Sequence, residues 1–277
     1  MSFKNDYNIE LLNSILQEFK NLNLEFLYKM VESMNLSGLL HDPRIIQAMH
    51  NIRIEDFITW EMIETFIPPQ FKQERVDPNI LRAILIQLFA NFYGNRPLLF
   101  YNDPKYARST AAPHMIVIMA QLVEVEPNDN VLILGSKSGY LESIIQDMDE
   151  NIKLYIIEKV PEIYRITKYN IDRINAGDKI KIYNMDPILD LNKLPIQEFD
   201  KIFITGYLNA LPKELYNRLK VGGLICGPFG NSNQQTLIRY FKINDEQYEE
   251  ENQGLVIFSP LITEFTPNPT NSIKLNL

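Results

Sequence analysis

The stretch NVLILGSKSGYLESII, residues 130–145, holds the first residues whose types and spacing could do chemistry. An apolar run ends at Leu134, two glycines and two serines follow around Lys137, and a second apolar pattern then begins. This order predicts a buried strand that turns sharply into a helix. Glycine allows positive φ angles and a close approach of a ligand to the backbone. Residues 135–139, the glycine turn, are therefore a candidate binding site, although many such turns only connect a strand to a helix.

Acidic residues stand at the ends of the next two predicted strands. KLYIIE ends in Glu158, about 20 positions beyond the glycines, where a carboxylate can accept both hydroxyls of a ribose. KIKIYNMD ends in Asp186, which could accept a hydrogen bond from an adenine amino group. Since the carboxyl ends of parallel strands share one edge of a sheet, an adenosine site is predicted there. The alternative is that both acids cap the structure that follows them.

The spacing within the glycine turn separates it from other nucleotide sites. A nicotinamide dinucleotide site normally uses Gly-x-Gly-x-x-Gly, and a phosphate loop ends in Gly-Lys-Ser or Gly-Lys-Thr. The turn has neither pattern. The order Gly135, Ser136, Lys137, Ser138, Gly139, followed by an aromatic residue, is more like a turn that binds S-adenosylmethionine.

The elements that must position these residues alternate from about residue 129 onward. Short apolar runs such as NVLIL, KLYII and KIFIT are separated by amphipathic segments such as PEIYRITKYNIDRIN. This alternation predicts an α/β fold, with a doubly wound, mostly parallel sheet and helices on both faces. GLVIFSPLITEF is expected to supply a last strand or pair of strands. The polar, proline-containing tail at 266–277 is expected to be flexible.

Residues 1–108 are predicted to form a helical region that leads into a loop. Apolar residues three and four positions apart recur through IELLNSILQEFKNLNLEFLYKMVESM, which gives a helix one buried face. Asp42 and Asp77 each precede a proline, so each is expected to be the N-cap of a helix. The region is therefore an N-terminal helical extension to the α/β domain expected at 109–265.

Composition excludes several classes of site. The formal net charge is −8, so no nucleic-acid partner is expected. A single cysteine, Cys226, excludes an intrachain disulfide, and three scattered histidines do not suggest a metal site. No leader peptide or long apolar span is visible, so the expected location is cytoplasmic, without a membrane partner. The oligomeric state stays open.

Three segments, in this order, resemble the protein-L-isoaspartate O-methyltransferase family. They are GLLHDPRIIQAMHNIRIEDFI, STAAPHMIVIMAQLVEVEPNDNVLILGSKSGY and FDKIFITGYLNALPKELYNRLKVGGLICGPFGNSNQQTL. The resemblance implies a Rossmann-like methyltransferase domain with S-adenosyl-L-methionine as cofactor. It also implies methyl transfer to the free carboxylate of an isoaspartyl or related residue in a damaged protein or peptide, a protein-repair reaction.

The resemblance also implies roles for particular residues. The loop at 109–114 would meet the substrate through Pro113 and His114, with Ser109 and Thr110 as the candidate catalytic hydroxyls. His114 could instead only start a helix and pack locally. The cofactor would be held by Gly135, Ser136, Ser138, Gly139, Glu158 and Asp186.

The sequence departs from the family pattern in four places. Ala111 stands where the family has a serine, Ile133 where an acidic residue is usual, and Lys137 where the turn has a central glycine. The segment at 58–92 is longer than the family's linker, and its helix could cover or reshape the substrate cleft. These changes leave open a noncatalytic homologue that serves as a binding or scaffold protein, or an enzyme with another methyl acceptor.

Overall fold

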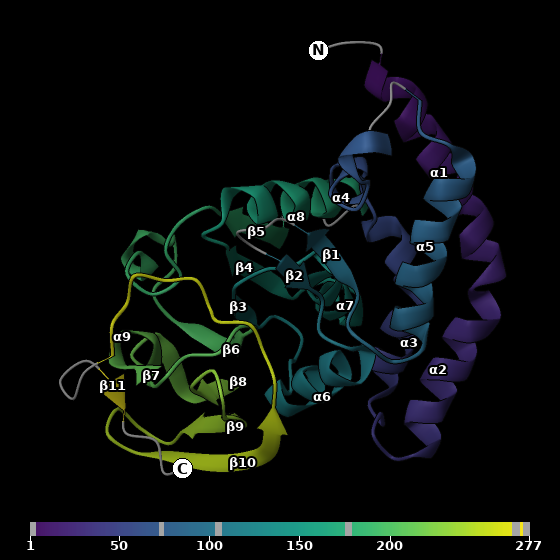
Figure 1. Ribbon diagram of the computed structural model, residues 1–277. Coiled ribbons are helices and arrows are strands. Elements are labelled where there is room, and N and C mark those ends of the chain that lie inside the picture. The colour runs from purple at the N-terminus through teal and green to yellow at the C-terminus, as the bar shows by residue number, and fades with distance from the viewer. Residues whose placement is uncertain (1–3, 72–74, 103–106, 175–178, 268–271, 274–277) are drawn as a thin grey trace. The chain divides into compact units, whose positions relative to one another are not determined.

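The computed structural model describes residues 4–71, 75–102, 107–174, 179–267 and 272–273 (Figure 1). The chain divides into two compact units. The first unit takes in Met1–Ile118, Lys137–Met148 and Tyr169–Ile174. The second takes in Met119–Ser136, Asp149–Lys168 and Asn175–Leu277.

The first unit is mainly helical, as predicted for the N-terminal region. A short antiparallel pair of strands, β1 (Leu99–Asn102) and β2 (Ala107–Ser109), precedes α6 (Pro113–Val123), which continues into the second unit. The other helices of this unit, besides the last residues of α8 (Pro161–Ile174), are α1 (Lys4–Leu22), α2 (Leu24–Leu36), α3 (Pro43–Asn51), η1 (Ile54–Phe57), α4 (Trp60–Glu64), η2 (Pro69–Phe71), α5 (Pro78–Tyr93) and α7 (Tyr140–Met148).

Both predicted Asp-Pro helix starts are confirmed. The Asp42 carboxylate accepts the backbone N–H of Arg44 at 2.8 Å, and Pro43 is the first residue of α3. The Asp77 carboxylate accepts the backbone N–H of Asn79, also at 2.8 Å, at the start of α5. Each cap satisfies an N–H group that has no partner within its own helix.

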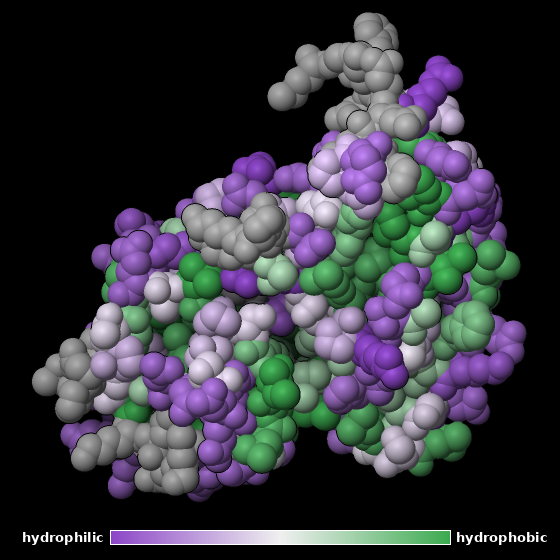
Figure 2. Space-filling model, viewed as in Figure 1, coloured by the Kyte–Doolittle hydropathy of each residue, from purple (hydrophilic) through white to green (hydrophobic). Residues whose placement is uncertain are grey.

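The segment at 58–92 supplies α4 and most of α5, and α5 packs against α1 within the first unit. Phe89 of α5 packs on Phe19 of α1 with ring centroids 5.3 Å apart. The Tyr93 hydroxyl donates to the buried Glu55 carboxylate at 2.8 Å. Figure 2 shows apolar surface over these helices, and the exposed apolar side chains of α1, α2 and α5 include Leu22, Leu24, Phe26, Tyr28, Leu36 and Ile86.

The second unit is built on a seven-stranded sheet with the order β10-β9-β8-β6-β3-β4-β5. The strands from β8 to β5 in this order run parallel, and β9 and β10 are antiparallel to their neighbours. Their bounds are β3 (Asn130–Leu134), β4 (Lys153–Ile157), β5 (Ile180–Tyr183), β6 (Phe199–Ile204), β8 (Leu219–Gly230), β9 (Gln235–Lys242) and β10 (Tyr248–Val256).

The predicted α/β class with a mostly parallel sheet is confirmed. Helix α7 links β3 to β4 along the chain, and α8 (Pro161–Ile174) links β4 to β5. After β5 the chain returns to the other side of β3 and forms β6. The order of strands therefore reverses between β3 and β6, and their carboxyl ends form the switch point where such sheets bind ligands.

The last strands differ in part from the prediction. Strand β10 ends at Val256, and the following residues up to 267 belong to no helix or strand. The tail predicted to be flexible falls largely outside the described residues, but Ser272 and Ile273 form β11 (Ser272–Ile273). This strand pairs with β7 (Leu211–Pro212), which precedes α9 (Lys213–Tyr216).

Helix η4 (Leu191–Lys193) lies between β5 and β6 in the chain. No helix in the described ranges is long and apolar enough to cross a membrane.

Candidate active site

The glycine turn has the backbone conformation that its two glycines predict. Gly135 has a φ of 78° and Gly139 a φ of 91°, both in the left-handed region that favours glycine. A Cβ atom at Gly135 would lie 2.9 Å from the Leu261 Cδ1 atom and 3.0 Å from the Thr205 Oγ1 atom. Position 135 therefore has a conformation that disfavours a side chain, and a Cβ atom there would press against Leu261 and Thr205.

Glu158 lies directly against the glycine turn. Its Oε2 atom accepts the backbone N–H of Ser136 at 2.9 Å, and its Oε1 atom accepts the N–H of Val160 at 2.7 Å. The residue is 6% exposed, so these bonds hold a carboxylate inside the carboxyl edge of the sheet. The bond to Ser136 brings together two residues that the sequence assigned to one site. The bond to Val160 is the local one that the capping alternative predicts.

Thr205 is a residue of this edge that the sequence reading missed. It follows β6, and its hydroxyl contacts the carbonyl oxygen of Leu134 at 3.2 Å and the carbonyl oxygen of Gly135. The hydroxyl of Ser136 donates in turn to Thr167 of α8 at 3.0 Å. The available signal was a threonine at the end of an apolar run, in KIFITG. Thr205 reaches the glycine turn because β6 lies beside β3 in the sheet, and this neighbour relation is not visible in the sequence.

Asp186 is bound by the chain itself on both carboxylate oxygens. It follows β5 at the same edge and is 8% exposed. Its donors are the backbone N–H groups of Ile188, Leu189 and Glu264, the Thr263 hydroxyl and the Lys159 ammonium, at 2.8–3.0 Å. Burial raises the pKa of this carboxyl, but these N–H groups and the lysine outweigh burial and hold the pKa well below its usual range.

This arrangement bears on the adenine role expected for Asp186. Two of its bonds run to residues two and three positions later, as the capping alternative predicts. A carboxylate offers about four acceptor sites, so five donors already meet its capacity. Pro187, the next residue, has no N–H to offer a ring nitrogen. An adenine amino group would reach this carboxylate only in exchange for one of the present donors.

The candidate hydroxyls of the substrate loop are placed differently from each other. Thr110 is buried, and its Oγ1 atom accepts the backbone N–H of Leu98 at 3.1 Å, while its own N–H donates to the Leu98 carbonyl. Ser109 is half-buried at the end of β2, in register with Leu99. Ala111, which offers no hydroxyl, is also half-buried. The Thr110 hydroxyl therefore joins the loop to Leu98, the residue before β1.

His114 is held by a residue that the sequence reading did not select. The Asn95 Oδ1 atom accepts the backbone N–H of His114 at 2.9 Å and lies 3.0 Å from its Nδ1 atom. Since this amide oxygen can only accept, the Nδ1 atom of His114 is the donor in this contact. Asn95 thus fixes the start of α6, whose first residue is Pro113, as the local-packing alternative for His114 predicts.

The other departures from the family pattern lie in the strand and the turn. Ile133 is fully buried in β3, in register with Ile156 of β4 and Phe203 of β6. A carboxylate at this position would have to lose its hydration among apolar side chains. Lys137 is half-buried. Among the residues that the structure describes, no group of three or more His, Cys, Asp or Glu could hold a metal ion.

The fold is that of Rossmann-like methyltransferases, as two comparisons with solved structures show. A protein-L-isoaspartate O-methyltransferase superposes with a TM-score of 0.65 at 18% identity, covering 84% of this chain and 65% of the other. A Plasmodium falciparum protein described as a protein-L-isoaspartate O-methyltransferase, in complex with S-adenosyl-L-homocysteine, gives 0.63 at 19% identity, covering 85% and 98%.

The sequence comparisons then identify the family. The family described as Protein-L-isoaspartate(D-aspartate) O-methyltransferase (PCMT) matches residues 81–265, and the chain belongs to it. The enzyme named protein-L-isoaspartate O-methyltransferase from Staphylothermus marinus is 23% identical over 244 residues, covering 86% of this chain and 94% of that relative. The one from Pyrococcus horikoshii is 34% identical over 158 residues, covering 57% and 70%.

Substitution of Gly135 tests the packing of the glycine turn. We expect Gly135→Ala to lower the free energy of unfolding by about 1–2 kcal/mol from left-handed strain, and by about 1 kcal/mol more from the contacts with Leu261 and Thr205. Gly222→Ala is the matched control, because Gly222 has a φ of 81° and nothing within 4 Å of its Cβ position. Urea unfolding measures both, and equal losses would contradict the close packing at position 135.

The low pKa of Asp186 predicts a definite pH dependence. A carboxyl whose pKa is lower in the folded than in the unfolded state stabilises fully above the unfolded pKa of about 4, and this stabilisation is lost as the pH falls through the folded pKa. The stability advantage of the wild type over Asp186→Asn should therefore be constant from about pH 8 to 5 and shrink below about pH 4. Urea unfolding at several pH values measures it. An advantage that stays constant or grows in acid would contradict the lowered pKa.

Proposed function

We propose that this protein is an S-adenosylmethionine-dependent carboxyl methyltransferase that acts on isoaspartyl or related carboxylates of proteins. The observation that carries the proposal is the bond between the Glu158 carboxylate and the Ser136 N–H, 2.9 Å long, at the switch point of the sheet. Membership of the family supplies the reaction class. The relatives are named for this activity, and one solved structure holds S-adenosyl-L-homocysteine, the product left by methyl transfer.

The residues at the glycine turn fit an adenosyl group. Glu158 places a buried carboxylate beside the turn, and two hydroxyls of a ribose are donors that such a carboxylate accepts. Gly135 keeps the turn free of a side chain at its first position. In this proposal Gly135, Ser136, Ser138 and Gly139 form the turn that flanks the cofactor. When bound, the cofactor supplies a methyl group on a sulfonium sulfur.

Methyl transfer to a carboxylate depends mainly on how the chain aligns the two reactants. A substrate carboxylate has a pKa of about 4 and is already ionised near neutral pH, so no strong general base is needed. The chain must hold the acceptor oxygen in line with the methyl group and keep water away from it. The missing hydroxyl at Ala111 is therefore compatible with activity. Ser109 is the better candidate to orient the acceptor, because Thr110 is buried and Ser109 is only half-buried.

The proposed partner is a protein or peptide with a free carboxylate, and the proposed location is the cytoplasm. Pro113 and His114 would contact this peptide. Asn95 holds both the His114 backbone and its ring, so in this proposal the ring would meet the peptide in a fixed orientation. The net charge of −8 argues against RNA as the acceptor.

Replacing Glu158 tests the place assigned to the ribose. We expect Glu158→Ala to weaken the binding of S-adenosyl-L-methionine by at least about tenfold, because the ribose hydroxyls lose their acceptor. Glu158→Gln keeps the side-chain volume and should bind with intermediate affinity. Calorimetry measures binding, and circular dichroism checks that the variants fold. Glu162→Ala, at a half-buried position in the first turn of α8, is the control and should bind normally. Unchanged affinity in Glu158→Ala would mean that the ribose lies elsewhere.

A pair of peptides tests the acceptor. We expect labelled methyl to transfer from S-adenosyl-L-methionine to a peptide with one isoaspartyl residue and not to its aspartyl twin, which presents its carboxylate on a different backbone. Counting the label in each peptide measures this. Cofactor binding with both peptides inert would reject isoaspartate as the acceptor. No binding even at about millimolar cofactor would favour the noncatalytic scaffold protein instead.

A further inference from the structure

The segment that follows β10 crosses the carboxyl edge of the sheet and is tied down along its length. We name residues 258–265 the C-terminal strap. In Figure 1 it belongs to the yellow line that leaves the tip of β10 and later turns down toward β11. Its first tie is the buried side chain of Gln235, which accepts the Phe258 N–H at 2.7 Å and donates to the Phe258 carbonyl at 3.1 Å. One amide side chain thus fixes both polar backbone groups of Phe258.

The middle of the C-terminal strap lies against the glycine turn. Backbone bonds of 3.0 Å join Tyr207 N–H to the Ser259 carbonyl and Leu261 N–H to the Tyr207 carbonyl. The Leu261 side chain is buried and occupies the space beside Gly135. The backbone N atom of Leu261 would lie 2.7 Å from a Cβ atom at position 206, where the chain has glycine. Any movement of the C-terminal strap therefore changes the wall of the proposed cofactor site.

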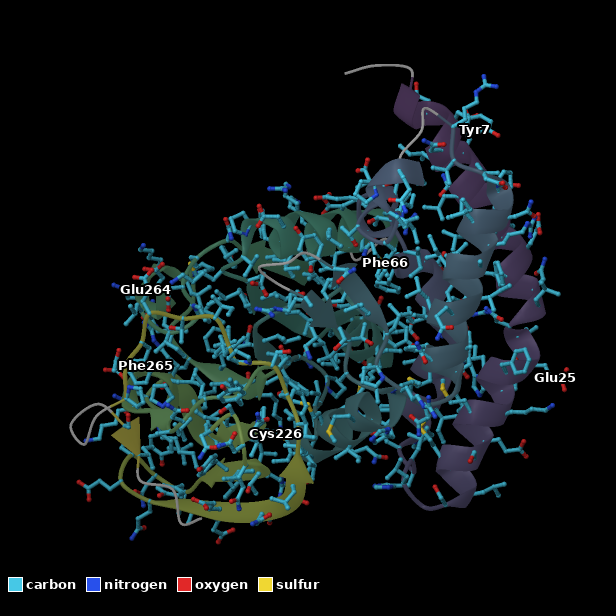
Figure 3. The ribbon with its side chains drawn as sticks, viewed as in Figure 1. Tyr7, Glu25, Phe66, Cys226, Glu264 and Phe265 are labelled. Atoms are coloured by element: carbon cyan, nitrogen blue, oxygen red, sulfur yellow. The ribbon has the colours of Figure 1, made fainter. Side chains whose placement is uncertain are left out.

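The far end of the C-terminal strap is held by Asp186. The Thr263 hydroxyl donates to its Oδ1 atom at 2.8 Å, and the Glu264 N–H donates to its Oδ2 atom at 2.9 Å. Lys159 bridges the Asp186 and Glu264 carboxylates, at 2.9 and 2.8 Å. Figure 3 labels Glu264 and its neighbour Phe265 on this part of the chain. Since hydrogen bonds to charged groups are among the stronger ones, this is the main polar attachment of that end.

We propose that Asp186 is a positioning residue, which latches the C-terminal strap beside the glycine turn and does not recognise the 6-amino group of the cofactor's adenine. The inference rests on the proposed function, because it assigns a role within the cofactor site of that enzyme. It follows from the saturation of the carboxylate by the chain's own donors. Loss of the latch loosens Leu261 and weakens the whole adenosyl site, whatever group the purine carries at position 6.

Two ligands and a set of variants test the latch. The ligands are S-adenosylhomocysteine and S-inosylhomocysteine, which has an oxo group where adenine has its amino group. The variants are Asp186→Asn, Thr263→Val, which removes one donor to Asp186, and Thr263→Ser, which keeps that hydroxyl. Calorimetry gives the two dissociation constants for each protein. Hydrogen exchange gives the protection of the backbone amides of the C-terminal strap.

We expect Asp186→Asn and Thr263→Val to speed exchange in the C-terminal strap and to weaken both ligands by the same factor, about threefold to tenfold. The ratio of the two dissociation constants then stays at the wild-type value, and Thr263→Ser behaves as the wild type. Wild-type exchange and affinity in Thr263→Ser, beside their loss in Thr263→Val, would assign the effect to the hydroxyl that donates to Asp186. The Thr263 variants keep the test valid if Asp186→Asn does not fold.

Other results overturn the proposal. If Asp186→Asn removes a preference for S-adenosylhomocysteine while exchange in the C-terminal strap is unchanged, Asp186 recognises the adenine amino group directly. If Thr263→Val leaves both exchange and affinity unchanged, Asp186 does not latch the C-terminal strap through this residue. If the wild type binds neither ligand, the proposed function fails separately, and the exchange data alone decide whether the latch exists.

Discussion

The hydrogen bond from the Ser136 N–H to the Glu158 carboxylate is the interaction on which the rest of the site depends. It joins the loop after β3 to the end of β4, and it buries a carboxylate beside a glycine whose positive φ disfavours a side chain. A buried carboxylate is stable only when donors surround it. The loop after β3 must therefore keep its conformation for Glu158 to remain in place, and Thr205 helps by bonding the carbonyls of Leu134 and Gly135.

Around this bond, the strand ends of the edge share a common construction. Each polar side chain there holds the backbone of a neighbouring segment: Glu158 holds Ser136, Thr205 holds Gly135, Asp186 holds Glu264, and Gln235 holds Phe258. Hydrogen bonds of this kind fix the backbone segments that form the wall of this edge, and the buried Leu261 side chain packs beside Gly135 within it. A transferase that works by alignment needs such a wall, because small displacements of the methyl donor cost rate.

The sequence predicts the parts of this structure that depend on local pattern. The caps at Asp42 and Asp77, the strand before Gly135 and the place of Glu158 follow from spacing and from the period of apolar residues. It does not predict Thr205, Gln235 or the donors of Asp186, because their partners lie far along the chain. Asp186 meets Thr263 and Glu264, which are 77 and 78 positions later. Such pairs follow from the order of strands and the path of the chain after β10, and neither is encoded in a short motif.

The most direct test of this account is a crystal structure of the protein with S-adenosyl-L-homocysteine bound. We expect the ribose hydroxyls to lie within hydrogen-bond distance of the Glu158 carboxylate, while Asp186 keeps its bonds to Thr263 and Glu264. A ribose placed away from Glu158, or an Asp186 carboxylate released from the C-terminal strap and bonded to the adenine amino group, would contradict it.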